Sequence, residues 1–339
     1  MAHSAMPTPI DECDCRSGEL DLAALIQQAR PRVLRGLVDA WPVVAWARES
    51  DTALARGLGA LDSGVEVDAL LMSPEEGGRV GYNADLSGFN YEHYRICVTD
   101  GLKRLVHESR QARPYGLAIQ SAPVATCLPG FLDHHRLPML DPAILPRLWI
   151  GNRVTTPAHF DEFHNVACVI GGRRRFTVFA PDQVDNLYIG PLDFAPTGAA
   201  ISMARLDQPD DPRFPRLKHA LAAAQVAELA PGDAIYLPPL WWHHVTSLER
   251  INALANYWWK PVPPGGVAAA TALGALLHAT LVFRSMGASE RAGWRAIVNH
   301  FAFGDPADAE HIPADRRGVL GTLSPAQAQR LREAIKRYL

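Results

Sequence analysis

Residues 148–259 form a succession of short apolar runs that are interrupted repeatedly by Gly and Pro. Each run is long enough for a strand but too short for most helices. The run at residues 165–170 ends at Gly171-Gly172, and residues 173–179 then alternate in polarity, which predicts a hairpin. Many short strands separated by turns predict a mainly β, double-sheet fold of jelly-roll type.

Helical periodicity is expected mainly outside this region. We expect helices over residues 19–30, 52–60 and 91–109 before it, and over 265–283, 289–300 and 325–338 after it. One further helix, over 217–229, would interrupt the strands. The domain prediction is a flexible leader at 1–18, a β-barrel domain with N-terminal helices at 19–264, and a C-terminal helical region at 265–339.

Composition excludes some classes of protein. Of 339 residues, 48% are hydrophobic and 20% are charged, which is enough apolar material for a large core. The net charge of -3 shows no basic excess, so nucleic acid is not an expected partner. Five Cys at irregular spacing, with no apolar segment near Met1, favour reduced thiols and a cytoplasmic location.

Residues 265–283 contain no charged side chain. The segment is long enough for a membrane span, but it is rich in Ala, Gly and Thr and includes His278. We expect no membrane span. A helix buried in the protein or in a homodimer interface fits this composition better.

The chemistry is expected to centre on His159 and Asp161. Side chains two residues apart in a strand point to the same face, so both can enter one cavity. An imidazole and a carboxylate provide two of the three ligands in the facial triad that binds non-haem Fe(II). Such a pair also arises by chance, so its meaning depends on the surrounding sequence.

A third ligand is available in the adjacent pair His243 and His244. Neighbouring residues of a strand face opposite sides, so only one of them can join His159 and Asp161. Two partly buried, hydrogen-bonded histidines are the alternative explanation for this pair.

Polar residues near these positions have two possible roles. Arg174 would point inward if Phe176 and Val178 line the interior, and a buried guanidinium needs an anionic partner. Alternatively, Arg173, Arg174 and Arg175 all extend into solvent. Three further polar residues also have two possible roles: Thr156, Asn165 and Asn256. They either form hydrogen bonds with backbone groups or bind the acid that would be the anionic partner of Arg174.

Several motifs in a fixed order resemble the cupin-like JmjC family, in particular its asparaginyl hydroxylase that inhibits hypoxia-inducible factor. They are densest over residues 148–260 and are as follows: Thr156-Pro157-Ala158-His159-Phe160-Asp161-Glu162, Asn165, Phe179-Ala180-Pro181-Asp182-Gln183, Pro231-Gly232-Asp233, Tyr236-Leu237-Pro238, Trp241-Trp242-His243-His244 and Asn256-Tyr257-Trp258.

The resemblance implies a double-stranded β-helix and a 2-oxoglutarate-dependent dioxygenase that hydroxylates a C–H bond with O₂. It implies Fe(II) bound by His159, Asp161 and His243, with 2-oxoglutarate beside it. Cosubstrate contacts would come from Thr156, Asn165, Arg174 and Asn256. Two departures from the family pattern are Arg174, where the hydroxylase has Lys, and Ala118, where it has a Tyr. The contact of that Tyr is either missing here or supplied by another residue, for which Tyr115 is the candidate.

The substrate is expected to be a protein, a peptide or another small target, with no readable code for it in the sequence. Three alternatives stay open. They are a metal-binding cupin without oxoacid chemistry, a binding module that has lost turnover, and an RNA-modifying hydroxylase. The resemblance also implies a homodimer through the C-terminal helices.

Overall fold

The computed structural model describes residues 7–16, 18, 20–260 and 272–336. It divides into two units, Met1–Trp259 and Lys260–Leu339. The first unit contains every strand in the described part of the chain and the whole of the candidate site, and the second is helical. Each unit is described by itself.

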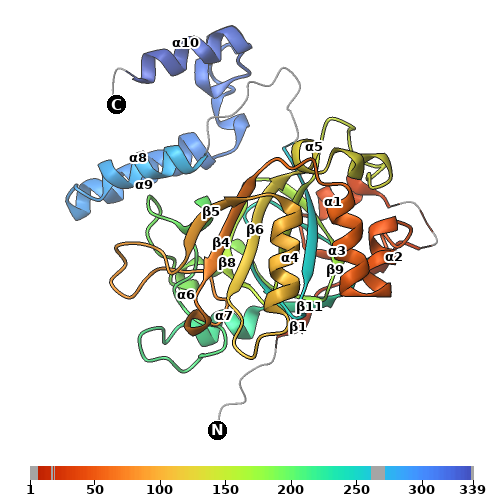
Figure 1. The fold of residues 1–339 in the computed structure, drawn as a ribbon. Coiled ribbons are helices and arrows are strands. Elements are labelled where there is room, and N and C mark those ends of the chain that lie inside the picture. Colours follow the sequence, from red (N-terminus) through yellow and green to blue (C-terminus); the bar gives the residue numbers. More distant parts are fainter. Residues whose placement is uncertain (1–6, 17, 19, 261–271, 337–339) are drawn as a thin grey trace. The chain divides into compact units, whose positions relative to one another are not determined.

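Two β-sheets form the centre of the first unit (Figure 1). The five-stranded sheet has the order β1-β11-β10-β13-β8, and the nine-stranded sheet has the order β2-β3-β12-β9-β14-β7-β6-β4-β5. The strands are β1 (Thr8–Pro9), β2 (Glu12–Asp14), β3 (Arg32–Arg35), β4 (Val67–Met72), β5 (Glu92–Ile96), β6 (Gly116–Pro123), β7 (Arg147–Gly151), β8 (Thr155–His159), β9 (His164–Gly171), β10 (Arg174–Phe179), β11 (Gln225–Leu229), β12 (Ala234–Leu237), β13 (Trp242–Ser247) and β14 (Asn252–Trp259).

An apolar core lies between the facing sheets. Phe176 and Val245 of the smaller sheet pack with Val169, Ile235 and Leu254 of the larger one, and all five are buried. This is the jelly-roll arrangement expected from the sequence. The described strands form two separate sheets that do not close into a ring. The open end leaves room for a pocket between them.

Helices cover the outer face of the nine-stranded sheet, where a second and larger core forms. Figure 1 shows α4 along β6, with α1, α2 and α3 beside them. The helices of this unit are α1 (Leu22–Gln28), α2 (Pro42–Glu49), α3 (Asp51–Ala60), α4 (Val98–Glu108), α5 (Val124–Cys127), α6 (Val184–Leu187) and α7 (Leu217–Ala223), with 3-10 turns η1 (Pro74–Glu76), η2 (Pro129–Asp133), η3 (Pro181–Gln183) and η4 (Pro196–Gly198).

Three local predictions differ from the structure. Part of the expected leader, residues 8–9 and 12–14, adds edge strands β1 and β2, paired in parallel with β11 and β3. The expected helix at 91–109 begins only at Val98, because β5 precedes it. The expected helix at 217–229 ends at Ala223, and β11 follows. In the last two cases, pairing with a distant strand outweighs local helical propensity. The expected hairpin is also wrong, because β9 pairs with β12 and β14, whereas β10 pairs with β11 and β13 in the other sheet.

The turn Pro231-Gly232-Asp233 has a structural role. Asp233 is buried, and its carboxylate accepts hydrogen bonds from the backbone N–H groups of Gly36 and Ala230 and from Arg35. Gly232 has φ +106, and a Cβ there would lie 1.9 Å from a carboxylate oxygen of Asp39. Only Gly fits this turn, which fixes β12 against β3.

The second unit contains α8 (Ala272–Phe283), α9 (Ala288–Phe303) and α10 (Pro325–Ile335), with 3-10 turns η5 (Pro306–Ala309), η6 (Ala314–Arg316) and η7 (Gly318–Leu320). Ser324 caps α10 with a capping box. The first part of the helix expected at 265–283 lies outside the described residues. Among the residues that are described, no helix has the length and apolar character needed to cross a membrane.

Candidate metal centre and pocket

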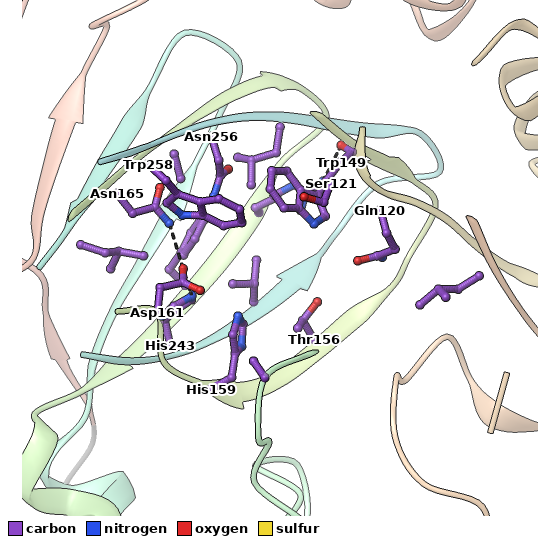
Figure 2. Close-up of a pocket in the computed structure, with 18 of the residues that line it drawn as sticks. Gln120, Ser121, Trp149, Thr156, His159, Asp161, Asn165, His243, Asn256 and Trp258 are labelled. Carbon is purple, nitrogen blue, oxygen red and sulfur yellow. Dashed lines mark hydrogen bonds and ion pairs between the residues drawn. The ribbon is translucent and has the colours of Figure 1, made fainter. Parts of the chain in front are cut away.

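A cavity of about 490 Å³ opens between the two sheets of the first unit (Figure 2). All seven residues predicted to form the site line it: Thr156, His159, Asp161, Asn165, Arg174, His243 and Asn256. They come from β8, β9, β10, β13, β14 and the loop after β8. The order of strands in the two sheets therefore brings together residues that are far apart in the sequence.

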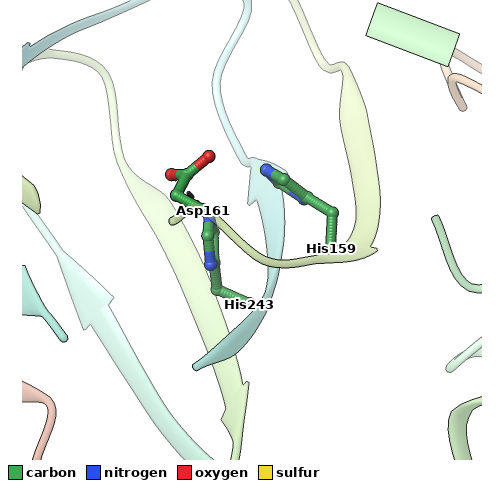
Figure 3. A group of neighbouring side chains, drawn as sticks. All are labelled: His159, Asp161 and His243. Atoms are coloured by element: carbon green, nitrogen blue, oxygen red, sulfur yellow. Dashed lines mark ion pairs between the residues drawn. The ribbon is translucent and has the colours of Figure 1, made fainter. Parts of the chain in front are cut away.

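His159, Asp161 and His243 form a cluster at one side of this cavity (Figure 3). One potential ligand atom from each residue lies within 4.8 Å of the other two. Nε2 of His243 is 3.6 Å from Oδ2 of Asp161, which is too long for a hydrogen bond. Two imidazoles and a carboxylate at this spacing need only small side-chain adjustments to share one cation.

Backbone carbonyl groups orient both imidazoles. Nδ1 of His159 lies 2.9 Å from the carbonyl oxygen of Pro157, and Nδ1 of His243 lies 3.0 Å from that of Trp241. Because a carbonyl only accepts, each Nδ1 carries the proton and each Nε2 keeps its lone pair. Burial and the nearby His159 lower the pKa of His243, so His243 is neutral at pH 7 and its Nε2 can bind a metal.

The prediction that Asp161 belongs to a strand is wrong. β8 ends at His159, and Asp161 lies in the loop that follows. Its carbonyl oxygen accepts the N–H of Leu240 at 2.8 Å, and its Oδ2 lies 3.4 Å from Nδ2 of Asn165. These contacts connect the loop to the segment before β13 and to β9, and they place the carboxylate beside the imidazoles.

Thr156 reaches the cavity through an irregularity in β8. His243 lies opposite His159 and Val245 lies opposite Thr156, so three steps along β8 match two along β13. In a regular strand, residues three apart face opposite sides. The extra residue of this bulge brings Thr156 and His159 to the same face.

Arg174 points into the cavity, as one of the two sequence interpretations predicted. Its neighbours Arg173 and Arg175 are exposed and pair with Glu249 and Glu228. Arg174 is only 7% exposed, and its Nη2 lies 3.4 Å from the carbonyl oxygen of Trp149. Burial lowers the pKa of its guanidinium to about 10, and no described residue forms an ion pair with it. The cavity thus contains a buried cation whose charge is uncompensated within the described chain.

Other polar atoms of the cavity also have unused hydrogen-bonding capacity. Oδ1 of Asn165, Oδ1 of Asn256 and Nε1 of Trp258 are buried, and the described structure provides no partner for them. Buried polar atoms normally have hydrogen-bond partners. Three buried atoms without partners in one cavity therefore indicate a binding site for a polar molecule. Trp149 stands edge-on to Trp258 at 5.0 Å and forms one wall.

The sequence did not identify the wall formed by β4, β5 and β6. Gln120 and Ser121 reach the cavity because β6 is irregular between Ile119 and Ala122, with Ser121 at φ +49. No sequence pattern marks this bulge. Tyr115, the suggested replacement for a missing tyrosine, is 42% exposed and does not line the cavity. The prediction for Tyr115 is wrong, whereas Tyr91 does line the cavity.

Comparison with known proteins agrees with this geometry. A cupin-like domain model matches residues 18–264, which is most of the chain and includes the whole pocket. The chain belongs to the cupin-like JmjC family. The closer resemblance to the asparaginyl hydroxylase stays a prediction.

Several known proteins are similar to part of the chain. The chain is 35% identical over 115 residues to Jumonji C domain-containing protein 5 of Drosophila melanogaster, covering 34% of the chain and 27% of that protein. It is 29% identical over 133 residues to lysine-specific demethylase JMJ31 of Arabidopsis thaliana, covering 39% and 23%. It is 31% identical over 113 residues to human HSPB1-associated protein 1, covering 33% and 22%. The matches thus span about a quarter of these relatives.

Proposed function

We propose that this protein is an Fe(II)- and 2-oxoglutarate-dependent oxygenase that hydroxylates a C–H bond. The observation that carries the proposal is the presence, in one cavity, of a His-Asp-His cluster and a buried guanidinium without a carboxylate partner. A metal alone would explain the cluster. An acidic cosubstrate bound beside it explains both features.

The donor set fits the proposed ion. Nε2 of His159, Nε2 of His243 and a carboxylate oxygen of Asp161 match the two-histidine, one-carboxylate set of non-haem Fe(II) oxygenases. Three protein ligands leave further positions open for small molecules. When bound, Fe(II) with 2-oxoglutarate and O₂ supplies oxidative decarboxylation of the oxoacid coupled to hydroxylation of a substrate C–H bond.

The protein contributes binding, orientation and exclusion of water. Arg174 would bind the distal carboxylate of the oxoacid through its planar guanidinium, assisted by the hydroxyl of Thr156. Asn165 would hold Asp161 in place, and the amide of Asn256 would hydrogen-bond the same acid. Trp149 and Trp258 cover the cavity with apolar surface, which keeps water from the reacting groups.

A cupin that binds metal without oxoacid chemistry fits less well. Burying an unpaired guanidinium is costly, and such a protein would gain nothing from it. A binding module without turnover is also disfavoured, because one potential ligand atom from each of the three candidate residues lies within 4.8 Å of the other two. The RNA-modifying alternative gains no support from the net charge of -3.

The substrate class is proposed more broadly as a protein, a peptide or a small molecule. Hydroxylation of an N-methyl carbon would lead to loss of the methyl group, and the Arabidopsis relative is named a lysine-specific demethylase. Mass spectrometry of candidate peptides would separate these outcomes. Stable hydroxylation adds one oxygen atom, whereas demethylation removes a methyl group.

Anaerobic titration tests the cofactor assignment. Fe(II) is added to the protein in the presence of 2-oxoglutarate, and the weak visible charge-transfer band of the chelate is followed. We expect a saturable band at one Fe(II) per chain. If the band is absent although the protein is folded by circular dichroism, the oxygenase proposal is wrong.

A further inference from the structure

A second cavity, of about 790 Å³, lies on the outer face of the five-stranded sheet. His244 lines it, whereas its neighbour His243 lines the metal pocket. The two consecutive histidines of β13 therefore serve opposite faces of the sheet. His244 is only 7% exposed, and its Nε2 has no hydrogen-bond partner among the described residues. The metal centre thus accounts for His243 but gives no role to His244.

Hydroxyl groups surround His244 on this face. Thr177 lies opposite it on β10, and Thr246 follows it by two residues on β13. Thr155 lies opposite Thr246 on β8. All three threonines line the cavity. The cross-strand register therefore brings three hydroxyl groups, which can donate hydrogen bonds, together with His244 on the outer face of the sheet.

Most charged side chains that line this cavity form ion pairs. Arg175 pairs with Glu228 at 2.6 Å and Arg205 pairs with Asp207 at 2.7 Å. At the rim, Glu75 pairs with Arg113 at 2.9 Å. Glu76 accepts a hydrogen bond from the neutral amide of Asn90 at 2.7 Å, so its carboxylate has no ion-pair partner within the described chain.

Arg79 is the exception among the cationic side chains that line the cavity. Its Nη2 donates to the carbonyl oxygen of Ala204 at 3.2 Å, but no carboxylate oxygen of the described residues lies within 4 Å of its guanidinium. Burial and the neighbouring Arg205 lower its pKa, and Asp207 partly offsets this effect. Guanidinium groups stay charged at neutral pH even so, and partial burial strengthens their need for an anion.

We propose that this cavity binds a small oxyanion, either a carboxylate or a phosphate. The anion would accept paired hydrogen bonds from Arg79 and further ones from the hydroxyls of Thr177 and Thr246, with the unpartnered Nε2 of His244 beside it. The site is distinct from the metal pocket, since the sheet separates them. The proposal does not depend on the oxygenase assignment.

Isothermal titration calorimetry with inorganic phosphate and with acetate tests this site. The full chain carrying Arg174→Gln is used without Fe(II) or 2-oxoglutarate, so that the first pocket does not contribute an anion site. We expect saturable binding of at least one probe. Adding Arg79→Gln should weaken it roughly tenfold or more, because a charge-assisted contact is lost. Thr177→Val, which keeps the shape of the side chain, should weaken it severalfold.

Arg213→Gln is the matched control, because Arg213 is exposed and pairs with Asp211 outside the cavity. It should leave binding unchanged. Binding of phosphate alone assigns the site to phosphate, and binding of acetate alone assigns it to carboxylates. Absence of binding by both probes, or binding that survives both Arg79→Gln and Thr177→Val, overturns the proposal. Circular dichroism of each variant confirms that a loss reflects the site and not unfolding.

Discussion

His243 lies directly opposite His159 in the antiparallel pair of β13 and β8, with ring centroids 4.2 Å apart. Both rings donate Nδ1–H to a carbonyl two residues earlier, so both present Nε2 toward Asp161. His244, the next residue, faces the other side of the sheet. The register of one strand pair therefore decides which histidine is the metal ligand.

Replacing the two histidines separately should give opposite results. His243→Ala removes one of three ligands, so we expect the Fe(II)–2-oxoglutarate absorption band to be lost. His244→Ala should retain it, because that ring points away from the metal pocket. Anaerobic absorption titration of both variants provides the measurement. A band that persists in His243→Ala and disappears in His244→Ala would reverse the assignment.

Arg174 should control affinity for the oxoacid. Arg174→Gln removes the buried cation, and we expect at least a tenfold loss of 2-oxoglutarate affinity, in line with roughly 1.5–3 kcal/mol for a hydrogen bond to a charged group. Titrating 2-oxoglutarate at saturating Fe(II) and following the same band measures it. Arg175→Gln, one residue later and on the exposed face, is the control. Equal affinity in both variants would contradict the assignment.

The same arginine should make the free protein less stable. A buried guanidinium without a counter-ion pays a desolvation cost that a methionine of similar length does not. We expect Arg174→Met to raise the free energy of unfolding by about 1–4 kcal/mol, by analogy with buried ion pairs replaced with apolar residues. Urea denaturation without 2-oxoglutarate tests this, and a clear destabilisation would show that Arg174 is already well satisfied.

His135 should make stability depend on pH. Its Nε2 accepts the N–H of Val43 in the first turn of α2, and its Nδ1 donates to the carbonyl of Phe131. Burial lowers the pKa of His135, with a smaller contribution from His134, so the folded state resists protonation. The stabilisation is therefore complete above the unfolded pKa of about 6.5 and is lost as the pH falls through the folded pKa.

The matched variant for this effect is His135→Gln, which does not titrate. Urea unfolding at pH 7 and pH 5 should show a smaller fall in stability for the variant, by up to about 1.4 kcal/mol per pH unit. Other histidines titrate in both proteins and cancel in the comparison. An identical fall in both proteins would exclude His135 as a cause.

The C-terminal unit is expected to form a homodimer. Neither α8 nor α9 buries a residue within the described chain, and Leu281 and Phe303 are 77% and 80% exposed. Exposing large apolar side chains such as these to water is unfavourable, and a protein partner would cover them. Multi-angle light scattering should give twice the mass of 37.0 kDa, and Leu281→Glu with Phe303→Glu should give a monomer. A monomeric mass for the unmodified chain would contradict the prediction.

Much of the fold was predictable because local patterns are strong where strands are short and turns contain Gly or Pro. The strands β9 and β10, the residues Phe176 and Val178 that face the core, and the inward direction of Arg174 follow from alternation along single strands. The predicted hairpin is wrong, because the turn at Gly171-Gly172 leads from one sheet into the other. The helix at 51–60 follows from its own periodicity. Strands β1, β2, β5 and β11 were missed, since their residues become strands only by pairing with other segments of the chain.

The sequence by itself indicated seven candidate residues that line the metal pocket, because a fixed order of His-x-Asp, an arginine after a glycine turn and a distant histidine is rare by chance. Tertiary structure decided how they meet. The bulge in β8 turns Thr156 toward His159, and the loop after β8 carries Asp161. The pairing of β13 separates His243 from His244. These outcomes depend on register between strands that are distant in the chain, and no local pattern encodes register.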